Sequence, residues 1–76
     1  MIFPVYRKYN GIEVWFKILS STEFIQYKKM GDRLLEDKVI AKIFPEKQFI
    51  QDMLNFYEDR WIEIGEAELN EFITPL

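Results

Sequence analysis

The chain has 76 residues and a mass of 9.3 kDa, which is the size of one small domain. Hydrophobic residues make up 49% of it and charged residues 30%, which excludes the apolar-poor, highly charged composition of disordered chains. Cysteine and histidine are absent, so disulfides, thiolate or imidazole metal sites and histidine-activated nucleophiles are excluded as well. We therefore expect residues 1–76 to form a single compact domain that is not an enzyme and has no catalytic residue, metal or cofactor.

The net charge of −3 and the pI of about 4.9 argue against nucleic acid as the main partner, because phosphate contacts need clustered Lys and Arg. The charge is nevertheless uneven along the chain. Residues 1–38 hold seven Lys or Arg and five Asp or Glu, a net +2, whereas residues 39–76 hold three and eight, a net −5. Solvated faces often have such an imbalance, so it assigns no partner by itself.

Runs of aliphatic and aromatic residues, such as Val14-Trp15-Phe16, stop at three residues, so the sequence predicts no helix that spans a bilayer. The first residues also lack the apolar core of a signal peptide, since Pro4 interrupts them early. We expect a cytoplasmic protein without a membrane partner.

Asn10-Gly11 lies between two strand-like runs and is the strongest local signal in the chain. A type I′ turn needs positive φ at both central residues, which Asn and Gly tolerate best, so the pair predicts a two-residue β-hairpin. In that register Tyr6 lies directly opposite Trp15. The other face of the hairpin is apolar apart from Arg7 and is expected to meet the core.

The predicted protein-interaction site is the face of this hairpin that carries Tyr6 and Trp15 together with Lys8 and Lys17. Because 17% of the chain is aromatic, a core this small is not expected to hold every ring, and Trp and Tyr are favoured at interfaces. Two alternatives stay open. The aromatic pair only stabilises the hairpin, or the C-terminal helix covers this face and makes the domain three-layered.

The hydrophobic period changes in the next segment. Ser20 followed by Glu23 has the spacing of a helix capping box, and Phe24 and Tyr27 fall three residues apart. Gly31 can then end a helix in the left-handed conformation. This pattern predicts a short helix over residues 21–30.

Residues 39–44 alternate as a well-covered strand that ends before Pro45, while residues 33–38 either extend it or form a turn. Pro45 and Glu46 suit the first turn of a helix, which is predicted over 46–58. A short strand over 61–64 follows, and Gly65 can serve as the N-cap of a final helix.

Together these elements predict an α+β fold in the order β-β-α-β-α-β-α. The N-terminal hairpin and one or two further strands form a small sheet, against which the helices pack. Its core is expected to contain apolar side chains from every part of the chain: Phe16, Ile18, Val39, Ile43, Ile50, Met53 and Trp61.

The spacing Trp61-x-x-Ile64-Gly65-x-x-Glu68-Leu69, with Phe16-Lys17-Ile18 in the hairpin and Phe49-Ile50-Gln51-Asp52-Met53 after Pro45, resembles small uncharacterised bacterial α+β proteins of unknown function. The resemblance extends over most of the chain. It implies a compact bacterial domain and attaches no activity, ligand or site residue to it.

These observations favour a small non-enzymatic protein-interaction module, which binds a protein partner or a second copy of itself, as a homodimer, through Tyr6, Trp15, Lys8 and Lys17. No small-molecule ligand is indicated. The alternative is a small regulatory protein that contacts nucleic acid through basic residues of its N-terminal half: Arg7, Lys8, Lys17, Lys28 and Lys29.

Overall fold

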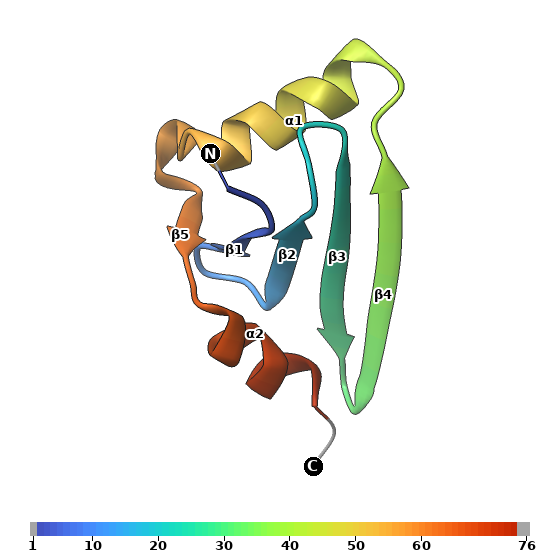
Figure 1. The fold of residues 1–76 in the computed structure, drawn as a ribbon. Helices are drawn as coiled ribbons and strands as arrows, with labels where there is room; N and C mark the ends of the chain where they lie inside the picture. The colour runs from blue at the N-terminus through green and yellow to red at the C-terminus, as the bar shows by residue number, and fades with distance from the viewer. Residues whose placement is uncertain (1, 75–76) are drawn as a thin grey trace.

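The computed structural model describes residues 2–74, and in these residues five strands and two α-helices follow one another (Figure 1). Every pair of neighbouring strands is antiparallel, in the order β4-β3-β2-β1-β5. The elements are β1 (Val5–Tyr9), β2 (Val14–Ile18), β3 (Glu23–Met30), β4 (Arg33–Ile40), α1 (Phe44–Leu54), the 3-10 turn η1 (Tyr57–Asp59), β5 (Trp61–Glu63) and α2 (Glu66–Ile73). The predicted α+β class is confirmed. The predicted order and the small number of further strands are wrong, because four strands precede the first helix.

The turn between β1 and β2 is longer than predicted and spans residues 10–13. Gly11 has a φ of 90°, but Asn10 does not have the positive φ that a type I′ turn requires. The Asn10 N–H instead donates to the Arg60 C=O at 2.7 Å, just before β5. Lys8 therefore lies opposite Trp15, two residues away from the predicted register. A shift of two residues keeps each side chain on its face, so the predicted sorting of the hairpin into two faces holds.

The predicted helix over residues 21–30 is wrong, because this segment forms β3. The Ser20 hydroxyl accepts a hydrogen bond from the Thr22 N–H at 3.1 Å, which closes a tight turn and does not cap a helix. Gly31, with a φ of 65°, is the first residue of a two-residue turn into β4. Phe24 and Tyr27 consequently lie on opposite faces of the sheet, in two different hydrophobic clusters. Residues 33–38, left open by the sequence, belong to β4. The prediction of a well-covered strand over 39–44 is wrong, because β4 ends at Ile40 and is exposed along most of its length.

The two helices cover opposite faces of the sheet, so the molecule has three layers. The cluster beneath α1 contains Phe16, Ile18, Phe24 and Trp61 from the sheet, together with Ile50 and Met53 of α1. The cluster beneath α2 contains Trp15 and Tyr27 from the sheet, together with Ile64, Leu69 and Phe72. Most of the predicted core residues are confirmed, and Val39 packs at the edge of the α1 cluster. Ile43 is the exception: it is 60% exposed because β4 has already ended and Ile43 is the N-cap of α1.

Helix α1 is shorter than the predicted span of 46–58, and a side-chain contact at its start and a left-handed residue after its end account for its bounds. Glu46 accepts hydrogen bonds from the N–H groups of Lys42 and Ile43 at 3.2 and 3.4 Å. The helix stops at Leu54, and Phe56 turns the chain away with a φ of 54°. The helix predicted to start at Gly65 is confirmed as α2, where Glu68 accepts from the Gly65 N–H at 3.5 Å.

Arg7 is the charged side chain buried between β1 and α1, with 5% of its surface exposed. Its Nε donates to the Met53 C=O at 3.0 Å in the last turn of α1, and its Nη1 donates to the Tyr6 C=O at 2.9 Å. The guanidinium also lies 4.3 Å from the centre of the Phe56 ring. Burial lowers the pKa of Arg7 from its ordinary value, and the charge of Glu63 opposes this shift. A cation at the carboxyl end of a helix satisfies an otherwise unpaired carbonyl.

Replacing Arg7 with Ala is expected to lower the free energy of unfolding by about 2–3 kcal/mol, because two hydrogen bonds to a buried charge are lost. Lys28→Ala is the control. Lys28 comes from the same face of the sheet but is exposed, and its replacement should change the value by less than about 0.5 kcal/mol. Urea unfolding followed by tryptophan fluorescence measures both variants, and equal effects would contradict the role given to Arg7.

Candidate functional site

The aromatic face of the N-terminal hairpin is covered, contrary to the expectation that it is exposed. Trp15 has 9% of its surface exposed, and its ring stacks on Phe72 of α2 with centroids 4.4 Å apart and planes 15° apart. Tyr6 is half-buried against the same cluster. The physical reason is the alternative considered from the sequence, a C-terminal helix lying over this face. The interaction role predicted for Tyr6, Trp15, Lys8 and Lys17 therefore loses the exposed rings on which it depended.

The basic residues of the N-terminal half do not form one patch, because the alternation of the strands divides them between two faces. Arg7 and Lys28 point toward the α1 side, and Lys8, Lys17 and Lys29 belong to the α2 side. Two of the latter lie over aromatic rings of the α2 cluster: the Lys8 Nζ is 5.4 Å from the Trp15 ring and the Lys29 Nζ is 4.5 Å from the Phe72 ring.

Trp15→Ala is expected to lower the free energy of unfolding by about 3–5 kcal/mol, because it removes the ring that fills the space under α2. The control is Ile12→Ala in the exposed turn between β1 and β2, which should cost less than about 0.5 kcal/mol. Thermal unfolding followed by circular dichroism distinguishes the two. A Trp15→Ala variant as stable as Ile12→Ala would show that the ring is dispensable for packing.

Strand β4 forms one edge of the sheet, because within residues 2–74 it pairs with β3 alone (Figure 1). The Ala41 N–H donates to the Thr22 C=O at 2.7 Å at the end of this ladder. Along an antiparallel ladder, hydrogen-bonded pairs alternate with pairs that are not hydrogen-bonded. The bond of Ala41 therefore shows which residues of β4 direct their N–H and C=O toward β3. The N–H and C=O of Arg33, Leu35, Asp37 and Val39 point toward β3. Those of Leu34, Glu36, Lys38 and Ile40 point away from the sheet.

Apolar side chains accompany these outward-facing backbone groups at both ends of β4. Leu34 and Leu35 at the start of the strand are 38% and 40% exposed, and Ile40 at its end is 52% exposed. The end of β3 adds the exposed Met30, and the start of α1 adds the exposed Phe44. The middle of the strand is charged, with Glu36, Asp37 and Lys38. Sequence reasoning missed this edge, although the Gly31-Asp32 pair between two alternating segments was a signal for a hairpin.

The charged residues on the α2 side of β4 already have partners within the chain. Lys38 forms an ion pair with Glu23 at 3.5 Å, and Glu36 accepts a hydrogen bond from the phenol of Tyr27 on the neighbouring strand. Burial, followed by the charge and hydrogen bond of Glu36, raises the pKa of Tyr27 above 10.0. These contacts hold the Glu36 and Lys38 side chains beside the sheet.

The raised pKa means that the folded chain holds the phenolic proton of Tyr27 more strongly than the unfolded chain does. Its contribution to stability is therefore complete below about pH 10 and is lost as the pH rises through the folded-state pKa. The free energy of unfolding of Tyr27→Phe should decrease less between about pH 9 and about pH 11 than that of the wild type. Urea titrations at the two pH values measure the difference. Tyr6, whose pKa is raised by burial and by Glu66, is present in both proteins, and its charge is among the causes that raise the pKa of Tyr27. Equal decreases in the two proteins would contradict the prediction.

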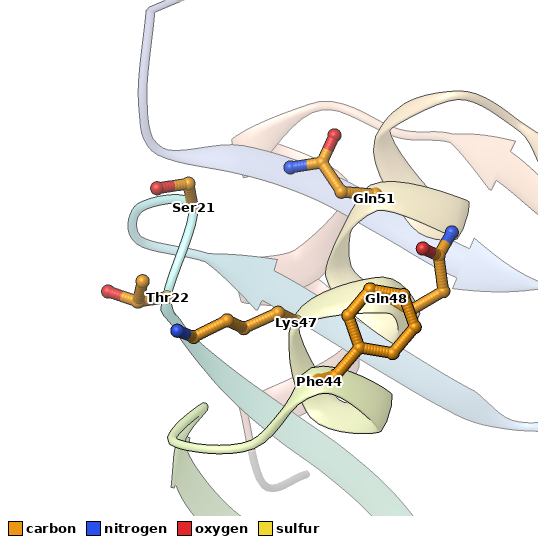
Figure 2. Close-up of a pocket in the computed structure, with 6 residues that line it drawn as sticks. All are labelled: Ser21, Thr22, Phe44, Lys47, Gln48 and Gln51. Atoms are coloured by element: carbon orange, nitrogen blue, oxygen red, sulfur yellow. The ribbon is translucent and has the colours of Figure 1, made fainter.

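Two surface hollows lie near the ends of β4. The first, of about 340 Å³, lies between α1 and the turn before β3, where Figure 2 shows Lys47 extended toward that turn. Its lining offers hydroxyl, amide and ammonium groups but no carboxylate: Ser21, Thr22, Phe44, Lys47, Gln48 and Gln51. The second, of about 570 Å³, lies where the β3–β4 turn meets the end of α2. It is lined by Lys29, Gly31, Asp32, Arg33, Leu34, Ile73 and Thr74.

Among the side chains that the structure describes, which leave out that of Asp59, no group of three or more acidic residues is arranged to hold a metal ion. Neither of the helices in this part of the chain is long and apolar enough to cross a membrane. No protein-family model, curated protein or solved structure matches the chain. The resemblance to small bacterial proteins stays a prediction.

Proposed function

We propose that this protein is a non-enzymatic interaction module that binds an extended segment of another polypeptide as an added strand along β4. Strand addition at a sheet edge obtains its affinity from main-chain hydrogen bonds and its specificity from the side chains that flank them. The observation that carries the proposal is the length of the edge: eight residues that pair on one side, with four of them directing their N–H and C=O away from the sheet. The cytoplasmic location expected from the sequence belongs to the same proposal.

The side chains of β4 favour a matched partner over indiscriminate pairing. Charged residues in the middle of an edge strand discourage association with an arbitrary chain, because an unmatched partner leaves them beside apolar groups or like charges. The exposed leucines at one end and Ile40 at the other offer apolar contacts on either side of that charged centre. The opposite edge of the sheet, β5, has three residues and offers a much shorter ladder.

Nucleic-acid binding is not retained as a second proposal. The basic residues on which that alternative depended lie on two faces of the sheet, and Arg7 is buried against α1. A phosphate backbone needs cations along one surface.

Lys38→Pro is expected to abolish strand addition without unfolding the domain. The Lys38 N–H points away from β3, so proline removes an outward donor and leaves the ladder to β3 complete. The probe is a displayed library of random peptides of about twelve residues, long enough to span the edge. Immobilised wild-type protein should retain a set of these peptides that Lys38→Pro does not retain.

Lys38→Ala is the matched control, because it loses the same ion pair with Glu23 but keeps the N–H. It should retain the peptides that the wild type retains, and circular dichroism should report the same fold for all three proteins. Retention by Lys38→Pro as well would overturn the proposed function. So would a wild type and a Lys38→Ala variant that retain no peptide and are monomeric, since a dimer joined through β4 would itself occupy the edge.

A further inference from the structure

We infer that the occupant of the β4 edge is the β4 edge of a second copy of this chain, joined antiparallel about a two-fold axis that passes through Asp37. The inference rests on the proposed function and names its partner. It is carried by the order of residues along β4 together with the direction in which each residue presents its backbone.

The backbone direction restricts the registers that two β4 strands can adopt. Outward N–H and C=O groups belong to Leu34, Glu36, Lys38 and Ile40, so a residue of this set must lie opposite a residue of the same set in the second copy. A two-fold axis through one residue of the strand satisfies this condition. A two-fold axis between two neighbouring residues does not, because it sets an outward residue against an inward one.

Only some of the permitted registers match side chain to side chain, and the axis through Asp37 matches both charged and apolar residues. It places Glu36 opposite Lys38 of the second copy, twice by symmetry, on the face covered by α2. On the same face Leu34 lies opposite Ile40, and on the other face Leu35 lies opposite Val39. Opposite charges and matched apolar groups each stabilise a cross-strand pair by about 0.2–1 kcal/mol. In the segment 34–40, residues at equal distances from Asp37 are therefore either both apolar or opposite in charge.

Neighbouring registers lose this match. An axis through Glu36 sets its carboxylate against its own copy and leaves Leu34 facing Lys38. An axis through Lys38 sets two ammonium groups against each other and leaves Glu36 facing Ile40. Like charges directly opposite one another destabilise a strand pair, so each of these registers replaces two attractive pairs with a repulsive one. Among the registers with an axis through residues 36 to 38, the pattern along β4 thus favours the one centred on Asp37.

Two existing contacts prepare the charged pairs for this arrangement. Lys38 is held at 3.5 Å from Glu23 on the neighbouring strand, and Glu36 is held by the phenol of Tyr27. In the dimer each Lys38 gains the Glu36 carboxylate of the second copy while it stays beside Glu23. The cost is at the axis, where the two Asp37 carboxylates face each other across a closely spaced pair.

The test uses two single variants, one that reverses the charge of Glu36 and one that reverses the charge of Lys38. Glu36→Lys alone sets lysine against Lys38 of its copy, and Lys38→Glu alone sets glutamate against Glu36 of its copy. Each single variant should dimerise at least about tenfold more weakly than the wild type, because both attractive pairs become repulsive. An equimolar mixture of the two variants restores two opposite-charge pairs and should form a heterodimer of wild-type affinity. Sedimentation velocity from about 10 µM to about 1 mM measures all four samples.

Asp37→Asn provides a second variant that acts in the opposite direction. It removes the like-charge contact at the axis and should tighten the dimer by up to about fivefold, whereas Asp52→Asn in α1, outside β4, should leave the dimer unchanged. Because asparagine keeps the size of the side chain, this variant is expected to fold where a charge reversal fails to do so.

A wild-type chain that is monomeric at the highest concentration overturns the inference. So does a mixture of the two charge variants that associates no better than either alone, or an Asp37→Asn dimer no tighter than the wild type. Peptide retention that still depends on the Lys38 N–H would then leave the docking edge in place with a different partner. Loss of both dimerisation and peptide retention would overturn the proposed function as well.

Discussion

The fold depends on the alternation of side chains along β2, in which Phe16 and Trp15 are neighbours in sequence but face opposite sides of the sheet. Phe16 contacts Phe49 and Trp61 in the cluster beneath α1, and Trp15 stacks on Phe72 in the cluster beneath α2. Each ring gives one helix its contact surface, so a strand of five residues organises both outer layers. A one-residue slip of β2 would exchange the two rings and misplace both helices at once. The size of the aromatic rings explains why a chain of this length can hold two separate clusters, because each ring buries on the order of 150–250 Å².

Local patterns in the sequence predict those elements whose period is unambiguous. The alternation around Asn10-Gly11 predicts a hairpin and its two faces, and Gly65 with Glu68 predicts the start of α2. The segment 21–30 fails because its residues satisfy two periods. Phe24 and Tyr27 fit a helical spacing of three. As a strand, the same segment places Ile25 and Tyr27 on one face and Phe24 and Gln26 on the other. The deciding information is the partner strand: β3 pairs with β2 and β4 on both of its sides, which a reading of local periodicity does not reveal.

Predicting the candidate site from the sequence required knowledge of the strand order even more than predicting the fold did. Residues 33–40 have the same sequence whether β4 lies in the middle of the sheet or at its edge, and only the strand order makes their outer backbone groups accessible. Conversely, Tyr6 and Trp15 are sorted correctly onto a face shared with Lys8 and Lys17, yet that face is covered by a helix more than fifty residues away in sequence. An aromatic residue on a mixed face is therefore ambiguous until the elements that pack over it are known. Charge and apolar patterning become informative about partners only after the edge has been located.

The unequal lengths of the two outer strands limit how far an assembly of this chain can grow. One border of the sheet, β4, offers eight residues, and the other, β5, offers three, which follow directly after the left-handed backbone of Phe56 and Glu58. In the proposed dimer, joined through the two long borders, every remaining border would be short, and a three-residue ladder would bind another copy much more weakly. Isologous contacts of this kind close on themselves, whereas a sheet with two equal borders would propagate into a filament. In the proposed dimer the brevity of β5 would therefore set a finite stoichiometry and oppose the growth of fibres.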